Sequence, residues 1–96
     1  MDVKFNVSDD TLKINLIDKI DSNNSEEYEK ECERILEENE HDKLILDAYD
    51  LLYTSSAGLR IILKLAKKEH DFKVINVSND VYEIFEMTGF TSMMTI

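Results

Sequence analysis

The amino-acid sequence predicts an α/β fold, in which a single mixed β-sheet of four to five strands is covered by helices mainly on one face. Two observations support this prediction. Segments with the apolar pattern of strands alternate with segments of helical periodicity. Three helices for four or five short strands also suit one sheet with most helices on the same side. With 96 residues, the chain is expected to form one domain, residues 1–96.

The first two strands are predicted from alternation. Apolar residues occupy every second position in two neighbouring segments, residues 3–7 and residues 12–16. The three residues Ser8, Asp9 and Asp10 between them are typical of a turn. Two alternating segments joined by a short turn predict a β-hairpin at the start of the chain.

A helix with one apolar face follows the hairpin. Asn24 and Glu27 approximate a capping box at its start. Residues 26–42 contain nine acidic and two basic side chains, which indicates a solvated, acidic outer face. The inner face has apolar residues at helical spacing, namely Tyr28, Cys32, Ile35 and Leu36. The same spacing predicts that three carboxylates are exposed, those of Glu29, Glu33 and Glu37.

The middle of the chain predicts a buried strand and a second helix. Residues 43–47 form a short, mostly apolar run of the kind found in strands that are covered on both faces. Residues 50–55 are expected to be a connection. The helix is expected to run from Ser56 to about Lys68, with apolar residues over more than half of its surface.

The last part of the chain predicts one more strand and a third helix. Residues 72–77 form a second apolar run. The helix that follows has Val81, Ile84 and Phe85 on one face, and Gly89 is expected to end it in a left-handed conformation. Residues 93–96 are expected to form a short final strand.

Composition limits the function. The formal net charge of −10 argues against nucleic acid and against anionic membrane surfaces as partners. Cys32 is the single cysteine, which suits a reducing compartment. No apolar run approaches the ~18 residues that would span a membrane, and no signal peptide is visible. These features together predict a cytoplasmic protein.

An enzymatic function is not predicted. His41 and His70 both follow helices among charged residues, where exposed loop histidines are expected. Cys32 lies on an apolar helix face and is expected to be buried and inert. Only two glycines, Gly58 and Gly89, are present, so no glycine-rich phosphate loop can form. No residues have the spacing of zinc ligands, and neither a catalytic residue nor a metal or cofactor is expected.

The serine-rich segment around residues 54–58 has two compatible interpretations. Ser55 or Ser56 can be the N-cap of the second helix, which is the commoner use of such residues. A phosphorylation site is a rarer use of the same position. The two roles agree, because the N–H groups and dipole at a helix N-terminus stabilise a phosphate.

Residues 44–60 resemble the signature of the STAS domain family, in which a buried strand ends in Asp and a short loop leads to a helix that opens with a Ser-x-Gly-Leu-like pattern. Three further segments agree with the family in the same order, residues 17–25, residues 74–77 and residues 81–90. Three positions differ from the residues that the family often has. Ser55 stands where the family often has Asp, Ala57 where it often has Ser or Thr, and Arg60 where it often has Gly.

The resemblance implies an anti-sigma factor antagonist. In such proteins the unphosphorylated form binds an anti-sigma factor serine kinase and frees the sigma factor. The kinase phosphorylates one serine, here Ser56 with Ser55 as the rival, and a phosphatase reverses this. The resemblance also implies a partner-binding surface that includes Asp21, Asn24, Thr54, Ser55, Ser56, Ala57, Gly58 and Arg60. Asp47 is expected to end the strand that leads to this surface.

The alternative is a STAS interaction module that is not phosphorylated, such as a subunit of a lipid-transport complex or a signalling scaffold. The Ser55 departure favours this alternative, because it changes the residue beside the expected phosphorylation site.

Overall fold

Strands and helices alternate along residues 3–89, the part of the chain that the computed structural model describes. The elements in chain order are β1 (Phe5–Ser8), β2 (Thr11–Ile20), α1 (Ser25–Glu38), β3 (Lys43–Thr54), α2 (Ser56–Lys68), β4 (Asp71–Ile75) and α3 (Asn79–Met87). This order is the predicted one. The strand expected at residues 93–96 lies outside the described residues.

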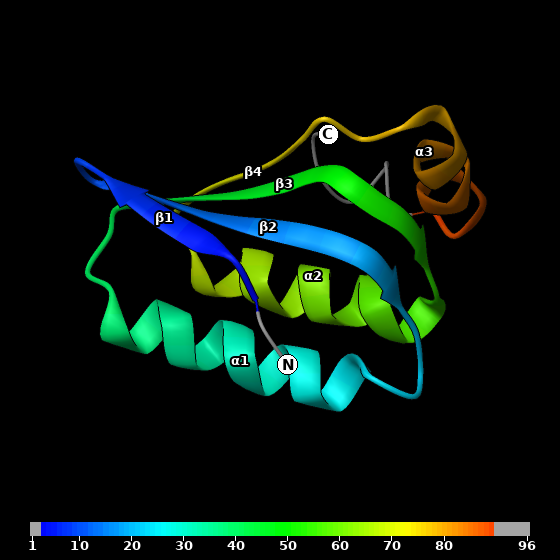
Figure 1. The fold of residues 1–96 in the computed structure, drawn as a ribbon. Helices are drawn as coiled ribbons and strands as arrows, with labels where there is room; N and C mark the ends of the chain where they lie inside the picture. Colours follow the sequence, from blue (N-terminus) through cyan, green and yellow to red (C-terminus); the bar gives the residue numbers. More distant parts are fainter. Residues whose placement is uncertain (1–2, 90–96) are drawn as a thin grey trace.

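The four strands form one mixed sheet in the order β1-β2-β3-β4. β1 pairs with β2 as an antiparallel hairpin, whereas β2–β3 and β3–β4 are parallel. Helices α1 and α2 lie side by side along one face of the sheet, and α3 lies at the end where β3 turns toward α2 (Figure 1). The predicted α/β fold, a mixed sheet with helices mainly on one face, is confirmed.

The core lies between the sheet and the α1–α2 layer. Alternate residues of β2 and β3 are completely or almost completely buried, and α1 and α2 contribute their apolar stripes from the other side. Each such side chain stabilises the fold by about 1.5–3 kcal/mol relative to an exposed position. On α1, Tyr28, Cys32 and Ile35 are buried and Leu36 is partly buried, so the predicted apolar face is confirmed.

The predicted end of β3 was wrong. This strand continues to Thr54, so residues 50–54 belong to the strand, only Ser55 connects it to α2, and Asp47 lies inside the strand. The reason is that β2 extends to Ile20 and pairs with β3 along its whole length. The expected cover on both faces is also wrong for residues 43–47: Leu44 and Leu46 are buried toward the helices, whereas Ile45 on the other face is partly exposed.

Three polar side chains are less exposed than predicted. Glu29 and Glu33 are partly buried because they face α2, where Lys64 Nζ lies 3.1 Å from Glu29 and Lys68 Nζ lies 3.7 Å from Glu33. Glu37 is exposed as predicted. His41 is not an exposed loop histidine: its side chain is 8% exposed and its Nε2 lies 2.7 Å from Glu69 Oε1. His70 is exposed.

Burial of two ionisable groups on α1 predicts a loss of stability in alkali. Burial raises the pKa of the Cys32 thiol to about 12, with the nearby Glu carboxylates adding to this, and burial also raises the pKa of Tyr28 to about 12. The unfolded chain releases these protons near pH 9.0 and 10.0, so the stabilisation is complete below about pH 9 and is lost as the pH rises toward 12.

We expect the unfolding free energy to fall by about 4 kcal/mol between pH 8 and pH 11, measured by urea denaturation. Cys32→Ala should be less stable at pH 8 because it leaves a small cavity. Its stability should, however, fall less steeply with pH than that of the wild type. Equal slopes for the two proteins would contradict the assignment to the Cys32 thiol.

Candidate functional site

The serine loop, defined as residues 54–58, lies beside the loop that follows β2. Ile20 and Thr54 are opposite each other at the end of the β2–β3 ladder. Ser55 N then donates to Ile20 O at 2.9 Å. Figure 1 shows the two connections, β2 to α1 and β3 to α2, next to each other at the same end of the sheet. The parallel pairing therefore places the loop after β2, which begins at Asp21, next to the serine loop.

The two serines have different environments. Ser55 is the N-cap of α2: its backbone is extended, and its Oγ accepts from Gly58 N at 3.5 Å. Ser56 is the first residue of the helix and is exposed. The capping role that the sequence left open between the two therefore belongs to Ser55.

Thr54 and Gly58 fix the start of α2 against the sheet. Thr54 is completely buried, and its Oγ1 donates to Ser55 O at 3.2 Å. Gly58 is also buried, and a Cβ there would overlap Thr54 Oγ1 and approach Ile20 Cγ2 to 2.9 Å. Glycine is required at residue 58 because the first turn of the helix touches the end of β2.

Asn24 holds the loop after β2 and does not cap α1. Its Oδ1 accepts from Asp21 N at 2.9 Å, and its Nδ2 donates to Lys19 O at 2.8 Å. Asp21 Oδ1 in turn accepts from Asn23 N at 2.9 Å. The predicted capping box is wrong, because the amide of Asn24 satisfies the backbone of the strand end. The network gives Asp21 and Asn24 a structural role next to the serine loop.

A shallow hollow of about 250 Å³ separates the first turns of α1 and α2. Ala57 and Arg60, two of the residues expected to bind the partner, line it from α2. Its other lining residues are Ser22, Ser25, Glu26, Glu29, Ile61 and Lys64. One wall therefore has cationic side chains and the other has carboxylates, which suits a polar protein contact better than an apolar ligand.

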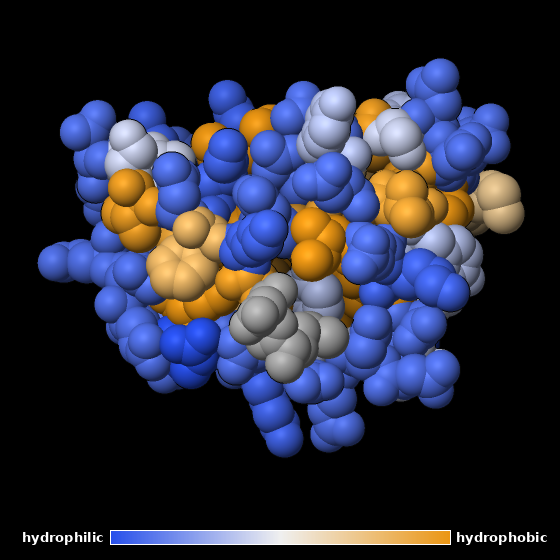
Figure 2. Space-filling view, in the orientation of Figure 1, coloured by the Kyte–Doolittle hydropathy of each residue, from blue (hydrophilic) through white to orange (hydrophobic). Residues whose placement is uncertain are grey.

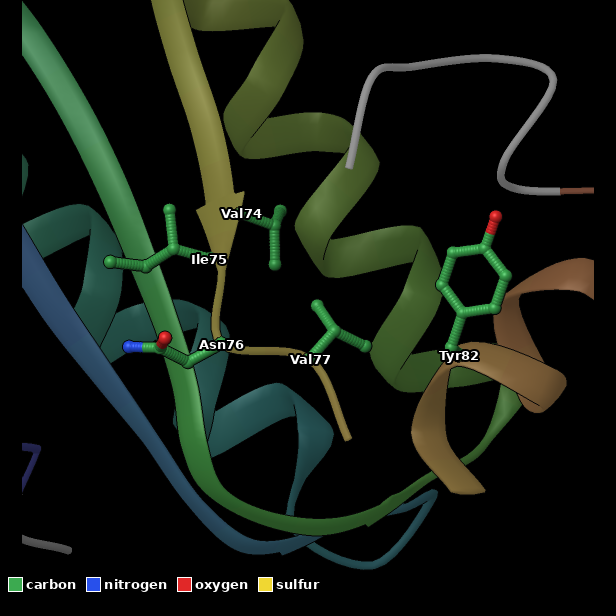
Figure 3. A pocket seen from close by; sticks show the side chains of 5 residues that line it. All are labelled: Val74, Ile75, Asn76, Val77 and Tyr82. Atoms are coloured by element: carbon green, nitrogen blue, oxygen red, sulfur yellow. The ribbon is translucent and has the colours of Figure 1, made fainter. Parts of the chain in front are cut away.

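A second hollow, of about 420 Å³, lies between the end of β4 and α3. Figure 3 shows Val74, Val77 and Tyr82 around it, with Asn76 turned toward β3. Asn76 adopts a left-handed conformation with φ 58°, and its Nδ2 donates to Asp47 Oδ1 at 3.1 Å. The sequence did not predict this hollow, whose lining has no ionisable group other than the Tyr82 hydroxyl.

The sequence also missed two large apolar side chains on the surface of β3. Tyr49 is 76% exposed and Leu52 is 71% exposed. A strand with strict alternation would not place Leu52 and Tyr53 in solvent side by side. The signal in the sequence was the mismatch between the apolar pattern of residues 48–54 and a period of two.

Over residues 3–89, no group of three His, Cys, Asp or Glu side chains is arranged to hold a metal ion. None of the helices in this described part of the chain is long and apolar enough to cross a membrane.

The fold and the serine loop define the class of protein. The family model described as the STAS domain matches residues 2–96, and the chain belongs to this family. Its similarity extends to a particular kind of member. BtrV of Bordetella bronchiseptica, a protein assigned as an anti-sigma factor antagonist, is 32% identical over 81 residues, which are 80% of this chain and 69% of that protein.

Solved structures share the fold at low sequence identity. An anti-sigma factor antagonist from Mycobacterium paratuberculosis has a TM-score of 0.84 at 15% identity, over 98% of this chain and 82% of that chain. The unphosphorylated form of the anti-sigma factor antagonist SpoIIAA has a TM-score of 0.76 at 16% identity, over 98% and 86%. The phosphorylated form of Bacillus SpoIIAA has a TM-score of 0.67 at 16% identity, over 98% and 89%.

Gly58→Ala is expected to destabilise the protein by about 1–3 kcal/mol, because the added methyl group overpacks the contact with Thr54 and Ile20. Thermal or urea unfolding measures this. The double variant Thr54→Ala/Gly58→Ala removes the Thr54 hydroxyl from the contact, so its loss should be smaller than the sum of the two single losses. Strict additivity would contradict the close approach.

The stabilities of Ser55→Ala and Ser56→Ala should show which of the two serines caps α2. Ser55→Ala removes the cap and should cost about 0.5–1 kcal/mol, the lower part of the usual range because its hydrogen bond is long. Ser56→Ala should change stability by less than about 0.5 kcal/mol, because Ser56 is exposed and alanine favours helices. A larger loss for Ser56→Ala would contradict the assignment of the cap.

Proposed function

We propose that this chain is an anti-sigma factor antagonist that binds an anti-sigma factor serine kinase and so releases a sigma factor, and that phosphorylation of Ser56 ends this binding. The observation that carries the proposal is the position of Ser56. It is the exposed first residue of a helix whose start is held by neighbouring residues rather than by Ser56 itself. A kinase can therefore reach its hydroxyl without unfolding the loop.

Ser56 is a better acceptor than Ser55. The Ser55 Oγ is used to cap the helix and the residue is partly buried, so its modification would compete with the fold. A phosphate on Ser56 would lie in the first turn of α2, where the N–H groups and the helix dipole favour negative charge. Arg60, one turn later on the same side of the helix and exposed, adds a cation within reach.

The added phosphate would end binding by electrostatics. It brings about −1.5 to −2 charges to a surface that already includes Asp21, in a chain whose formal net charge is −10. An interface that excludes water cannot solvate such a charge. Unless the partner protein offers a cationic side chain to pair with the phosphate, the phosphate weakens binding strongly. The fold itself need not change for the switch to work.

The relatives support this proposal. BtrV is assigned as an anti-sigma factor antagonist, and SpoIIAA, which shares the fold, has been solved in an unphosphorylated and a phosphorylated form. For this chain we propose in addition that a phosphatase restores the active form, that the protein acts in the cytoplasm as one STAS domain, and that it works by binding rather than by catalysis or with a cofactor.

The test compares Ser56→Ala, Ser56→Asp and a matched control, Asn79→Asp. Asn79 is the exposed first residue of α3, directly after the capping serine Ser78, so the control adds the same charge at the same helix position. We expect Ser56→Asp to be at least as stable as the wild type, because its charge suits the dipole. Its affinity for the kinase should nevertheless fall more than about tenfold.

Ser56→Ala should bind the kinase like the wild type but accept no phosphate from it, and Asn79→Asp should bind and be phosphorylated normally. Calorimetry and phosphate incorporation measure these outcomes. Unchanged binding by Ser56→Asp, or phosphate found on Ser55, would contradict the assignment. A wild-type chain that binds a transport ATPase instead of a kinase would favour the alternative, a STAS module that is not phosphorylated.

A further inference from the structure

β3 has two more residues than the strand it pairs with. β2 has 10 residues and β3 has 12, and the ladder between them runs from Thr11 opposite Lys43 to Ile20 opposite Thr54. The difference is absorbed by two register shifts, one between Asn15 and Ile17 and one between Asp18 and Lys19. Each shift is a β-bulge that leaves β3 with one residue that has no partner across the ladder.

The first bulge lies at Tyr49, whose side chain faces away from the helices in regular alternation with the buried Leu46 and Ala48. Asn15 is opposite Asp47 and Ile17 is opposite Asp50, so two residues of β3 face one residue of β2. Asp47 Oδ1 holds the irregular backbone by accepting from Tyr49 N at 3.0 Å and from Asn76 Nδ2 at 3.1 Å. The Tyr49 side chain is left 76% exposed.

The second bulge places Leu52 in solvent. Asp18 is opposite Leu51 and Lys19 is opposite Tyr53, so Leu52 is the extra residue. Asp18 accommodates the shift in a left-handed conformation with φ 55°. Leu51 before it is buried, whereas Leu52 is 71% exposed and Tyr53 after it is 44% exposed.

Large apolar side chains thus face outward around the two bulges, in the half of β3 that leads to α2. Bulges are frequent next to functional sites, where they change the direction of a side chain. Most of the apolar area of each residue stays in water, which forgoes the stabilisation that burial would provide. Figure 2 shows apolar atoms reaching the surface at the end of the molecule where β3 turns toward α2 and where α3 lies.

The charged side chains that border these two residues are mainly acidic, with Lys19 opposite Tyr53 as a cation among them. Asp18 and Asp50 are both exposed and lie on the paired strands at the level of the bulges. The same strand continues directly into Ser55 and Ser56, so Leu52 is only four residues from the proposed phosphorylation site. At about 3.3 Å per residue, the bulges and Ser56 fall within the width of one protein interface.

We infer that Tyr49 and Leu52 are the apolar anchors by which this chain docks on its anti-sigma factor. The inference rests on the proposed function and deepens it. The complementary surface of the partner is an apolar pocket bordered by Lys or Arg side chains, because Asp18 and Asp50 border the anchors here. Exposed aromatic and apolar anchors enclosed by charged groups are the usual source of binding energy in such interfaces.

The test measures binding of Tyr49→Ser and Leu52→Ser to the purified anti-sigma factor kinase that binds the wild-type chain. Each variant should bind at least about tenfold more weakly. Each should keep the thermal midpoint of the wild type within about 2 °C, because the side chains are exposed. Val7→Ser is the matched control. Val7 is an exposed apolar strand residue on β1, near the opposite end of the sheet, and its replacement should change affinity less than about threefold.

The role of the Asp18 and Asp50 carboxylates is tested by the rate of association with the kinase. The double variant Asp18→Asn/Asp50→Asn should associate more slowly at low salt, with little change in the dissociation rate. Asn suits residue 18 because it tolerates the left-handed conformation. Faster association of this variant would overturn the basic border assigned to the partner.

The outcomes distinguish this inference from the proposed function. If Ser56→Asp abolishes binding while Tyr49→Ser and Leu52→Ser bind like the wild type, the anchors are wrong and the proposed function stands. If no anti-sigma factor kinase binds the wild-type chain, both are overturned. If sedimentation shows that Leu52→Ser breaks a dimer and leaves kinase binding intact, the occupant of this surface is a second copy, and the inference is overturned.

Discussion

The parallel pairing of β2 with β3 is the interaction on which the rest of the structure depends. It is the longest ladder in the sheet, and its buried side supplies most of the strand residues of the core. It also ends in the hydrogen bond from Ser55 N to Ile20 O, which positions the serine loop beside the loop after β2. Residues that are more than 30 positions apart in the chain thus come to share one surface.

Buried contacts fix the start of α2, and the exposed side chain of Ser56 is not needed for them. Thr54 is buried, Gly58 touches Ile20, and Ser55 caps the helix. None of these contacts uses the side chain of Ser56. A group added to Ser56 therefore meets solvent and the helix dipole rather than the core, which allows the surface charge to change while the fold stays the same.

Periodicity was enough to predict the order of elements and much of the core, because burial of one face leaves a local pattern in the sequence. Tyr28, Cys32 and Ile35 were found in this way. Features that need a partner distant in sequence were not found. The length of β3 depends on β2, and the partial burial of Glu29 depends on Lys64. The role of Asn24 was missed for another reason, since its amide bonds backbone groups of the preceding loop and strand end that have no sequence pattern of their own. For the site, the resemblance indicated the serine loop, but only three-dimensional contacts could assign the cap to Ser55.

The two irregularities in β3 explain why pattern and structure diverge most where function is proposed. A regular 12-residue strand would turn every second side chain toward the helices. Continued from Leu46 and Ala48, this alternation would bury Leu52. The two extra residues shift the alternation after Tyr49, so that Leu51 is buried and Leu52 is exposed. Asp47 accepts from Tyr49 N, and Asp18 adopts a left-handed conformation at the second shift. Leu51 and Thr54 stay buried, so the same segment contributes to the core and exposes apolar area. Exposing the apolar area of Tyr49 and Leu52 does not stabilise the fold. It is explained if a partner docks on these side chains beside Ser56.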